Sequence, residues 1–195
     1  MNKLPQTFLD LTTTLKDRYP WDKWSGAVNM VMVDQYMAFI KRSNDMPSHK
    51  GQLGFFGGHK AGRETPIDTA LRETWEESGI PQDKFEVLGL VEPVFTSRRR
   101  LIIPIVSRFR EPLEDFVASA KTNGEWSDLI LVPLEKLKNN DSWQYAQMKV
   151  DSDYKIYFCP LGADQCYMHP ENLEQEYLLW GASAKMVWNY FKFQA

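Results

Sequence analysis

The sequence contains few cysteines, no long hydrophobic run and little excess charge. Its 195 residues include two cysteines, Cys159 and Cys166, too few for a disulfide framework, and their spacing fits no common zinc-binding pattern. The apolar runs are only a few residues long, whereas a membrane-spanning helix needs roughly 20. The 23 basic and 26 acidic residues nearly balance, so the strongly basic surface of a general nucleic-acid binder is absent. We therefore expect a protein that neither crosses a membrane nor binds nucleic acid.

The N-terminal residues and the composition favour a cytoplasmic globular protein. Residues 1–20 lack a continuous apolar segment and include Asp10 and Asp17, so they do not look like a secretory signal. Hydrophobic residues make up 43% of the chain and charged residues 25%, an ordinary composition for a globular protein. No repeat or linker rich in proline and glycine divides residues 1–195. We expect one domain.

Hydrophobic spacing predicts helices mixed with strands. Leu4, Phe8, Leu11 and Leu15 recur at helical spacing and predict an N-terminal helix over about residues 5–18. Two apolar segments around Asp34-Gln35 predict a β-hairpin, and residues 43–54 read as a loop. We expect further strands at 85–95, 101–109, 126–132 and 155–158, short helices at 113–122 and 133–137, and a C-terminal helix over 173–193, interrupted near Gly181. The pattern indicates an α/β fold with mixed alternation.

Residues 65–78 form the most clearly delimited helix and carry three glutamates on one face. Thr65 can cap its start, with Pro66 at the first helical position, and Gly79 supplies a stop. Glu73, Glu76 and Glu77 stand at positions i, i+3 and i+4. A solvated acidic face is one interpretation. The other is a site for a hard divalent cation such as Mg²⁺, which prefers oxygen ligands and suits a phosphorylated substrate.

The residues around these glutamates resemble the signature box of the Nudix hydrolases. Each fixed position of that box is filled, by Gly58, Glu64, Arg72, Glu73, Glu76, Glu77 and Gly79, followed by Ile80. Thr74 is slightly polar for the position that it occupies. With each residue at about 6% background, a chance match is on the order of 10⁻⁸ to 10⁻⁹ per starting position. The resemblance implies an α/β/α sandwich with a mixed β-sheet and hydrolysis of a diphosphate linked to another group.

The resemblance also implies roles for these residues. Glu73, Glu76, Glu77 and the backbone carbonyl of Gly57 would bind Mg²⁺ or Mn²⁺, which neutralises diphosphate charge and lowers the pKa of a bound water. Arg72 would orient a catalytic glutamate, Glu76 among the candidates, and Glu64 would pair with Arg72. A plain surface ion pair is the alternative for Arg72 and is compatible with this role.

A further carboxylate comes from a later loop in many Nudix enzymes, and Glu125 stands where the family commonly has it. It directly precedes the strand expected at residues 126–132. Glu125 is therefore a candidate catalytic base or metal ligand. The alternative interpretation is an ordinary turn glutamate.

Two segments outside the box resemble the coenzyme A pyrophosphatase subfamily. The first keeps the identity and spacing of that subfamily's signature at Arg42, Ser43, His49, Gly51, Phe55, Gly57 and Gly58, and the second is the stretch from Trp180 to Lys185. The signature departs at Phe56, which replaces a proline, and at Pro47, which replaces an arginine. The lost arginine would be a bidentate phosphate donor.

The candidate substrate-binding residues are accordingly Arg42, His49, Gly51, Arg98, Arg99 and Arg100. The three consecutive arginines can replace the missing donor or form a solvated basic turn. His49 can instead be a loop histidine satisfied by backbone, whereas His59 and His169 read as structural or exposed residues.

The resemblance thus implies a Mg²⁺- or Mn²⁺-dependent hydrolase of coenzyme A or acyl-coenzyme A. The products would be 3′,5′-ADP and 4′-phosphopantetheine or its acyl derivative. One alternative is another nucleoside diphosphate substrate, such as ADP-ribose, a nucleotide sugar or a dinucleotide. A second is a non-catalytic module that senses a nucleotide. The expected partner is a small nucleotide-derived molecule, and the chain is a possible homodimer.

Overall fold

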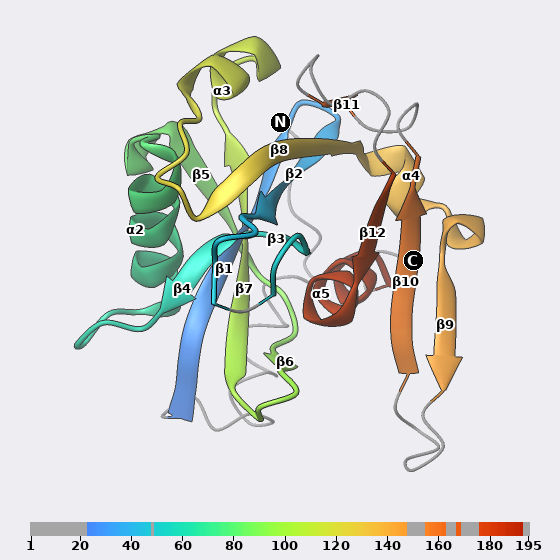
Figure 1. Cartoon of the computed structure of the whole chain (residues 1–195). Coiled ribbons are helices and arrows are strands. Elements are labelled where there is room, and N and C mark those ends of the chain that lie inside the picture. The colour runs from blue at the N-terminus through green and yellow to red at the C-terminus, as the bar shows by residue number, and fades with distance from the viewer. Residues whose placement is uncertain (1–22, 48, 148–154, 163–166, 169–175, 193–195) are drawn as a thin grey trace.

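The computed structural model describes residues 23–47, 49–147, 155–162, 167–168 and 176–192 (Figure 1). The helix expected over residues 5–18 lies outside these ranges, as do Cys166 and His169. Within the described ranges, no helix is both long and apolar enough to cross a membrane.

A large mixed sheet forms the centre of the fold. Six of its strands run in the spatial order β11-β8-β2-β1-β7-β5, and three short strands pair at the ends of β1, β2 and β7. β1 and β7 are parallel, and the other pairs are antiparallel. The strands are β1 (Trp24–Val33), β2 (Tyr36–Arg42), β3 (Leu53–Gly54), β4 (Phe56–His59), β5 (Phe85–Leu90), β6 (Val94–Phe95), β7 (Leu101–Phe109), β8 (Trp126–Pro133) and β11 (Tyr167–Met168).

Helices cover both faces of this sheet, which confirms the expected sandwich (Figure 1). Side chains alternate along each strand, so Val31 packs with helices α2 (Pro66–Ser78) and α3 (Leu113–Ser119). Its neighbour Met30 packs with α5 (Gly181–Lys192) on the other face. Shorter helical segments are α4 (Leu134–Lys138), η2 (Gln82–Lys84) and η3 (Asn140–Ser142).

The hairpin predicted around Asp34-Gln35 is present. Met32 pairs with Met37 and Val33 with Tyr36, so a two-residue turn joins β1 to β2. Asp34 takes a left-handed backbone conformation with φ 49°, which this short-chain residue tolerates in tight turns.

The prediction of a helix over residues 173–193 is wrong for residues 177–180. Tyr177–Trp180 forms strand β12, which pairs with β10 (Lys155–Leu161), itself paired with β9 (Gln144–Gln147) in a second, three-stranded sheet. Tyr177 and Leu179 are buried and Leu178 and Trp180 exposed, a period of two that suits a strand. The helix begins at Gly181, where φ is 68°.

Three other boundaries differ from the sequence prediction. The strand expected over residues 85–95 is divided into β5 and β6, both paired with β7, and Pro93 lies in the break, where it has no N–H to donate. The expected loop over residues 43–54 ends in the short strand β3, which pairs with β2. Helix α3 ends at Ser119, three residues before the expected end.

Candidate active site

Helix α2, which carries the glutamates, begins and ends as predicted. The Asp68 N–H donates to Thr65 Oγ1 (3.2 Å) and the Thr65 N–H donates to Asp68 Oδ2 (3.0 Å), a reciprocal capping box. Gly79 takes the left-handed conformation with φ 75°, and its N–H donates to the Trp75 carbonyl. These caps fix the register in which the glutamates face the loop before the helix.

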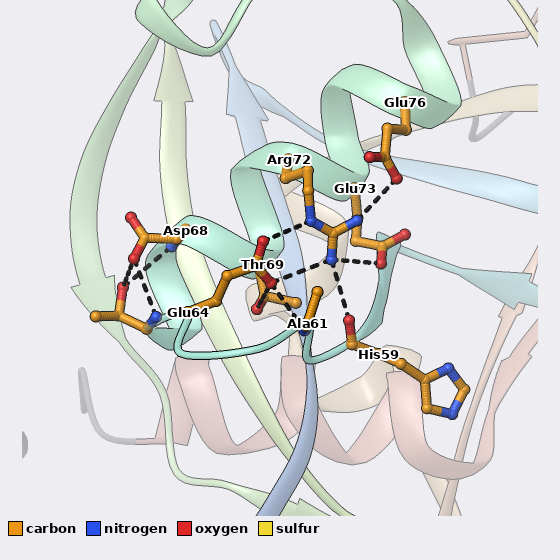
Figure 2. Close-up of polar contacts among 9 residues, drawn as sticks. His59, Ala61, Glu64, Asp68, Thr69, Arg72, Glu73 and Glu76 are labelled. Atoms are coloured by element: carbon orange, nitrogen blue, oxygen red, sulfur yellow. Dashed lines mark hydrogen bonds and ion pairs between the residues drawn. The ribbon is translucent and has the colours of Figure 1, made fainter.

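Arg72 is the centre of the charged cluster on α2 (Figure 2). Its Nε donates to Glu64 Oε1 (2.7 Å) and its Nη1 to Glu76 Oε2 (2.8 Å). Nη2 lies 2.9 Å from Glu73 Oε1 and donates to the His59 carbonyl (3.0 Å). Glu64 foremost, and then Glu73 and Glu76, raise the pKa of this guanidinium. The predicted pairing of Glu64 with Arg72 is present, and Arg72 also contacts two of the three clustered glutamates.

Glu64 connects the loop that follows β4 to helix α2 through hydrogen bonds. Beyond Arg72, its Oε2 accepts from Thr69 Oγ1 (2.7 Å) and from the Ala61 N–H (3.0 Å). These bonds, that of Arg72 above all, lower the pKa of Glu64 to about 2. Glu64 therefore stays ionised at neutral pH and acts as a fixed anchor.

Glu77 is the most buried of the three clustered glutamates, at 2% exposed. Its Oε2 accepts from the Gly57 N–H (2.9 Å). Burial first, and then the negative charges of Glu125 and Glu73, raise the pKa of Glu77 to about 8. The Gly57 N–H and the positive charge of Arg42 act in the opposite direction. The site thus concentrates more negative charge here than the described groups compensate.

Glycine is required where β4 meets α2. A Cβ on Gly58 would lie 2.4 Å from the carboxylate of Glu73, and one on Gly57 would lie 2.5 Å from the Ala27 carbonyl oxygen. Gly57 also has φ 151°, a conformation that other residues rarely adopt. Gly58 leaves room for the Glu73 carboxylate, and Gly57 lets β4 pack closely against β1.

The donor set fits a hard divalent cation by its chemistry. Glu73, Glu77 and the backbone of Gly57 offer oxygen ligands around an excess of negative charge, which a cation would compensate. Glu76 is turned toward Arg72 and is more exposed. Among the residues that the structure describes, no three His, Cys, Asp or Glu side chains converge closely enough to form a complete metal cage. Glu73 and Glu77 are the glutamates that the fold brings against the glycine backbone.

Arg42 and Glu125 lie on neighbouring segments beside Glu77. Arg42 pairs with Trp126 across β2 and β8, and the Ser43 N–H donates to the Glu125 carbonyl (2.8 Å). The Glu125 carboxylate accepts from Asn123 Nδ2 at 3.4 Å, a long hydrogen bond. The Nε of Arg42 is buried and has no hydrogen-bond partner within the part of the chain that is described. The fold thus brings a free buried donor next to the carboxylates.

The other predicted substrate residues divide into those near the site and those further out. The Gly51 N–H donates to the Arg42 carbonyl (3.0 Å), and the exposed His49 Nδ1 lies 3.0 Å from Gln52 Oε1. Arg100 Nη1 lies 2.7 Å from Nε2 of His59, the last residue of β4, whose carbonyl binds Arg72. Arg98 and Arg99 are exposed, and their side chains form no hydrogen bond or ion pair with the other described residues. Of the three arginines, Arg100 is the one whose side chain contacts the end of β4.

Sequence reasoning missed two buried groups that support the helix. The Trp126 indole N–H donates to the Glu77 carbonyl (2.8 Å). Asn29 Nδ2 donates to Thr74 Oγ1 (3.1 Å), which explains why a polar residue occupies that slot of the box. The polar Thr74 at an otherwise aliphatic position was the signal that could have predicted the contact with Asn29. The sequence offered no signal for the contact of Trp126.

Comparisons with known proteins identify the family of this chain. A family model described as NUDIX domain matches residues 24–150, a span that contains α2 and Glu125. A relative named uncharacterized Nudix hydrolase NudL, from Photorhabdus laumondii, is 31% identical over 154 residues, 77% of this chain and 73% of its own. One named mitochondrial coenzyme A diphosphatase NUDT8, from Mus musculus, is 29% identical over 147 residues, 74% of this chain and 63% of its own. A solved Nudix hydrolase from M. smegmatis, RenU, aligns with TM-score 0.48 and 18% identity over 58% of this chain and 73% of that one.

Proposed function

This chain belongs to the Nudix family and is a pyrophosphohydrolase, and we propose that its substrate is coenzyme A or an acyl derivative. Water adds to one phosphorus of the diphosphate, the bridging P–O bond breaks, and a proton is released. The products are 3′,5′-ADP and 4′-phosphopantetheine, the latter acylated when the substrate is. A relative of similar sequence that is named coenzyme A diphosphatase supports this choice.

The observation that carries the proposal is Arg42. Its buried Nε has no acceptor among the described residues, and its charge acts on Glu77. Buried donors are almost always paired, so an unpaired guanidinium N–H beside a phosphate-cleaving site suits an oxygen of the substrate. Arg42 also stands at the arginine of the coenzyme A-type signature, together with His49 and Gly51.

The reacting groups would divide the work as follows. Family members use divalent cations, and Glu73, Glu76, Glu77 and the Gly57 carbonyl would hold Mg²⁺ or Mn²⁺, which supplies charge neutralisation and activates water. Arg72 would hold Glu76 and Glu73 in place through the contacts described above. Glu125 acts electrostatically on both Glu73 and Glu77 and is the candidate base.

A substrate panel tests the proposal. The value of kcat/KM is measured for coenzyme A, 3′-dephospho-coenzyme A, ADP-ribose and a nucleotide sugar at one Mg²⁺ concentration, and repeated with Mn²⁺. We expect coenzyme A or its acyl form to have the highest value. If kcat/KM for ADP-ribose or a nucleotide sugar exceeds that for coenzyme A by more than tenfold, the proposed substrate is wrong. The assignment as a pyrophosphohydrolase would still stand.

Arg100 is our candidate to bind the phosphate in place of the signature arginine that Pro47 replaces. The contact with His59 places its guanidinium at the loop that follows β4. Arg100→Ala should lower kcat/KM for coenzyme A by about tenfold or more and leave 3′-dephospho-coenzyme A within twofold, because a charge-assisted contact to the 3′-phosphate is lost. Arg108→Ala is the matched control, since Arg108 lies near the far end of β7 and pairs with Glu86. Equal losses on both substrates would contradict this role.

A cytoplasmic location and a homodimer stay predictions from the sequence. Cell fractionation measures the first, and size-exclusion chromatography with light scattering measures the second.

A further inference from the structure

Trp126 supplies a hydrogen bond that helix α2 cannot make for itself. The Glu77 carbonyl lies in the last turn of α2, and its ordinary donor would be the N–H of the residue four positions on. That residue is Pro81, which has no N–H. The Trp126 indole, 49 residues along the chain, donates to this carbonyl instead, at 2.8 Å in a buried setting. The C-terminal end of α2 is therefore stabilised by a hydrogen bond from a residue outside the helix.

The same tryptophan contacts several of the segments that form the site. It directly follows Glu125 and pairs with Arg42 across the strands. Its ring packs edge-on against Phe56, with 6.1 Å between the ring centroids, and Phe56 precedes the Gly57 whose N–H binds the Glu77 carboxylate. Thr122 Oγ1 donates to the Trp126 carbonyl (2.6 Å), which closes the turn that contains Glu125.

We propose that Trp126 is a positioning residue: its indole N–H fixes the end of α2 against the turn of Glu125, and so sets Glu77 and Glu125 at the spacing that cation binding and hydrolysis require. This role rests on the proposed assignment of Glu77 as a metal ligand. A residue that orients ligands through hydrogen bonds typically changes metal affinity or activity by 10–100-fold when it is replaced.

The test compares Trp126→Phe with Trp143→Phe. Both substitutions keep an aromatic ring and remove one indole N–H from a helix-end carbonyl, because Trp143 Nε1 donates to the Leu137 carbonyl (2.9 Å) in the last turn of α4. Mn²⁺ affinity of the metal-free protein is measured by calorimetry, together with kcat, KM and Tm. We expect Trp126→Phe to weaken Mn²⁺ binding and lower kcat by about tenfold or more. Trp143→Phe should leave both within twofold at a similar loss of Tm.

Equal effects of the two variants on Mn²⁺ affinity and kcat would overturn the positioning role. Glu77→Gln, measured alongside, separates this failure from a failure of the site itself. If Glu77→Gln binds Mn²⁺ normally, the metal-site assignment is wrong. If it binds weakly while Trp126→Phe binds normally, only the role of Trp126 is wrong.

A measurement on the unaltered protein covers the case in which Trp126→Phe does not fold. In ¹⁵N-tryptophan-labelled protein titrated with Mg²⁺, the indole N–H resonance of Trp126 should shift with the same apparent Kd as the onset of activity, and that of Trp143 should stay in place. A Trp126 resonance that does not move through saturation would overturn the inference.

Discussion

Glu77 places a carboxylate where the described residues do little to stabilise its charge. It is 2% exposed, has one backbone donor, and lies near two other carboxylates. Glu77→Gln removes the charge and keeps the shape, and the amide oxygen can still accept from the Gly57 N–H. We expect the metal-free variant to keep or exceed the wild-type Tm at neutral pH. With its pKa raised to about 8, Glu77 must take up a proton or bury a charge when the protein folds, and the amide avoids that cost. Turnover should nevertheless fall by about 10²-fold or more, since a charge-stabilising group in the active site is lost.

Thermal melts in EDTA and kcat at saturating Mg²⁺ check this prediction. Glu86→Gln is the matched control, because the Glu86 side chain is 46% exposed and forms a long ion pair with Arg108 (3.6 Å). It should leave both quantities near wild type, as exposed ion pairs contribute little. A Glu77→Gln variant that melts several degrees lower and hydrolyses at the wild-type rate would show that Glu77 stabilises the fold and has no part in the chemistry.

At the scale of elements, a buried polar chain joins α2 to two strands of the main sheet. Ser107 Oγ on β7 donates to Asn29 Oδ1 on β1 (2.7 Å), and Asn29 Nδ2 donates to Thr74 Oγ1 (3.1 Å). Thr74 Oγ1 in turn donates to the Ala70 carbonyl (2.7 Å). Ser107, Asn29 and Thr74 are fully buried, so each hydrogen bond removed leaves a polar atom without a partner.

A double-mutant cycle tests this link. Thr74→Val should cost about 1–3 kcal/mol of unfolding free energy, because the Asn29 amide loses its acceptor. Asn29→Leu with Thr74→Val should cost less than the sum of the single changes, by about 0.5–3 kcal/mol. Urea unfolding of the four proteins measures both quantities. Additive effects would mean that the two side chains do not depend on each other.

Local signals explain which elements the sequence could predict. The α2 helix begins at a capping box and ends at Gly79, and the first hairpin is set by its turn, so neighbouring residues suffice for both. Strand β12 is different, because Tyr177–Trp180 reads as helix or strand until β10 is known to pair with it. Likewise the box predicts three glutamates on one face, and only the approach of β4 shows that the Glu77 carboxylate is the one that binds the Gly57 N–H. Long-range contacts settle what short-range spacing leaves open.

At the scale of the whole molecule, one hydrophobic core joins the second sheet to the main one. Cys159 on β10 is fully buried in the same cluster as Met30 and Phe39 of the main sheet and Val187 of α5. Burial raises the pKa of this thiol to about 11. The reactive thiolate is therefore a small fraction at pH 8, on the order of 10⁻³, and reagents reach it only when the core opens. If the chain unfolds as one cooperative unit, exposure of Cys159 must follow unfolding of the main sheet.

Thiol labelling measures this cooperativity. In a Cys166→Ser background, so that Cys159 is the one thiol, labelling at pH 8 should be very slow in buffer and complete in denaturing urea. Between these limits the extent of labelling should follow the same urea midpoint as far-UV circular dichroism, because Cys159 shares its core with the main sheet. Labelling that is complete at urea concentrations well below the circular-dichroism transition would show instead that the second sheet and α5 open on their own. The single-domain prediction would then be wrong.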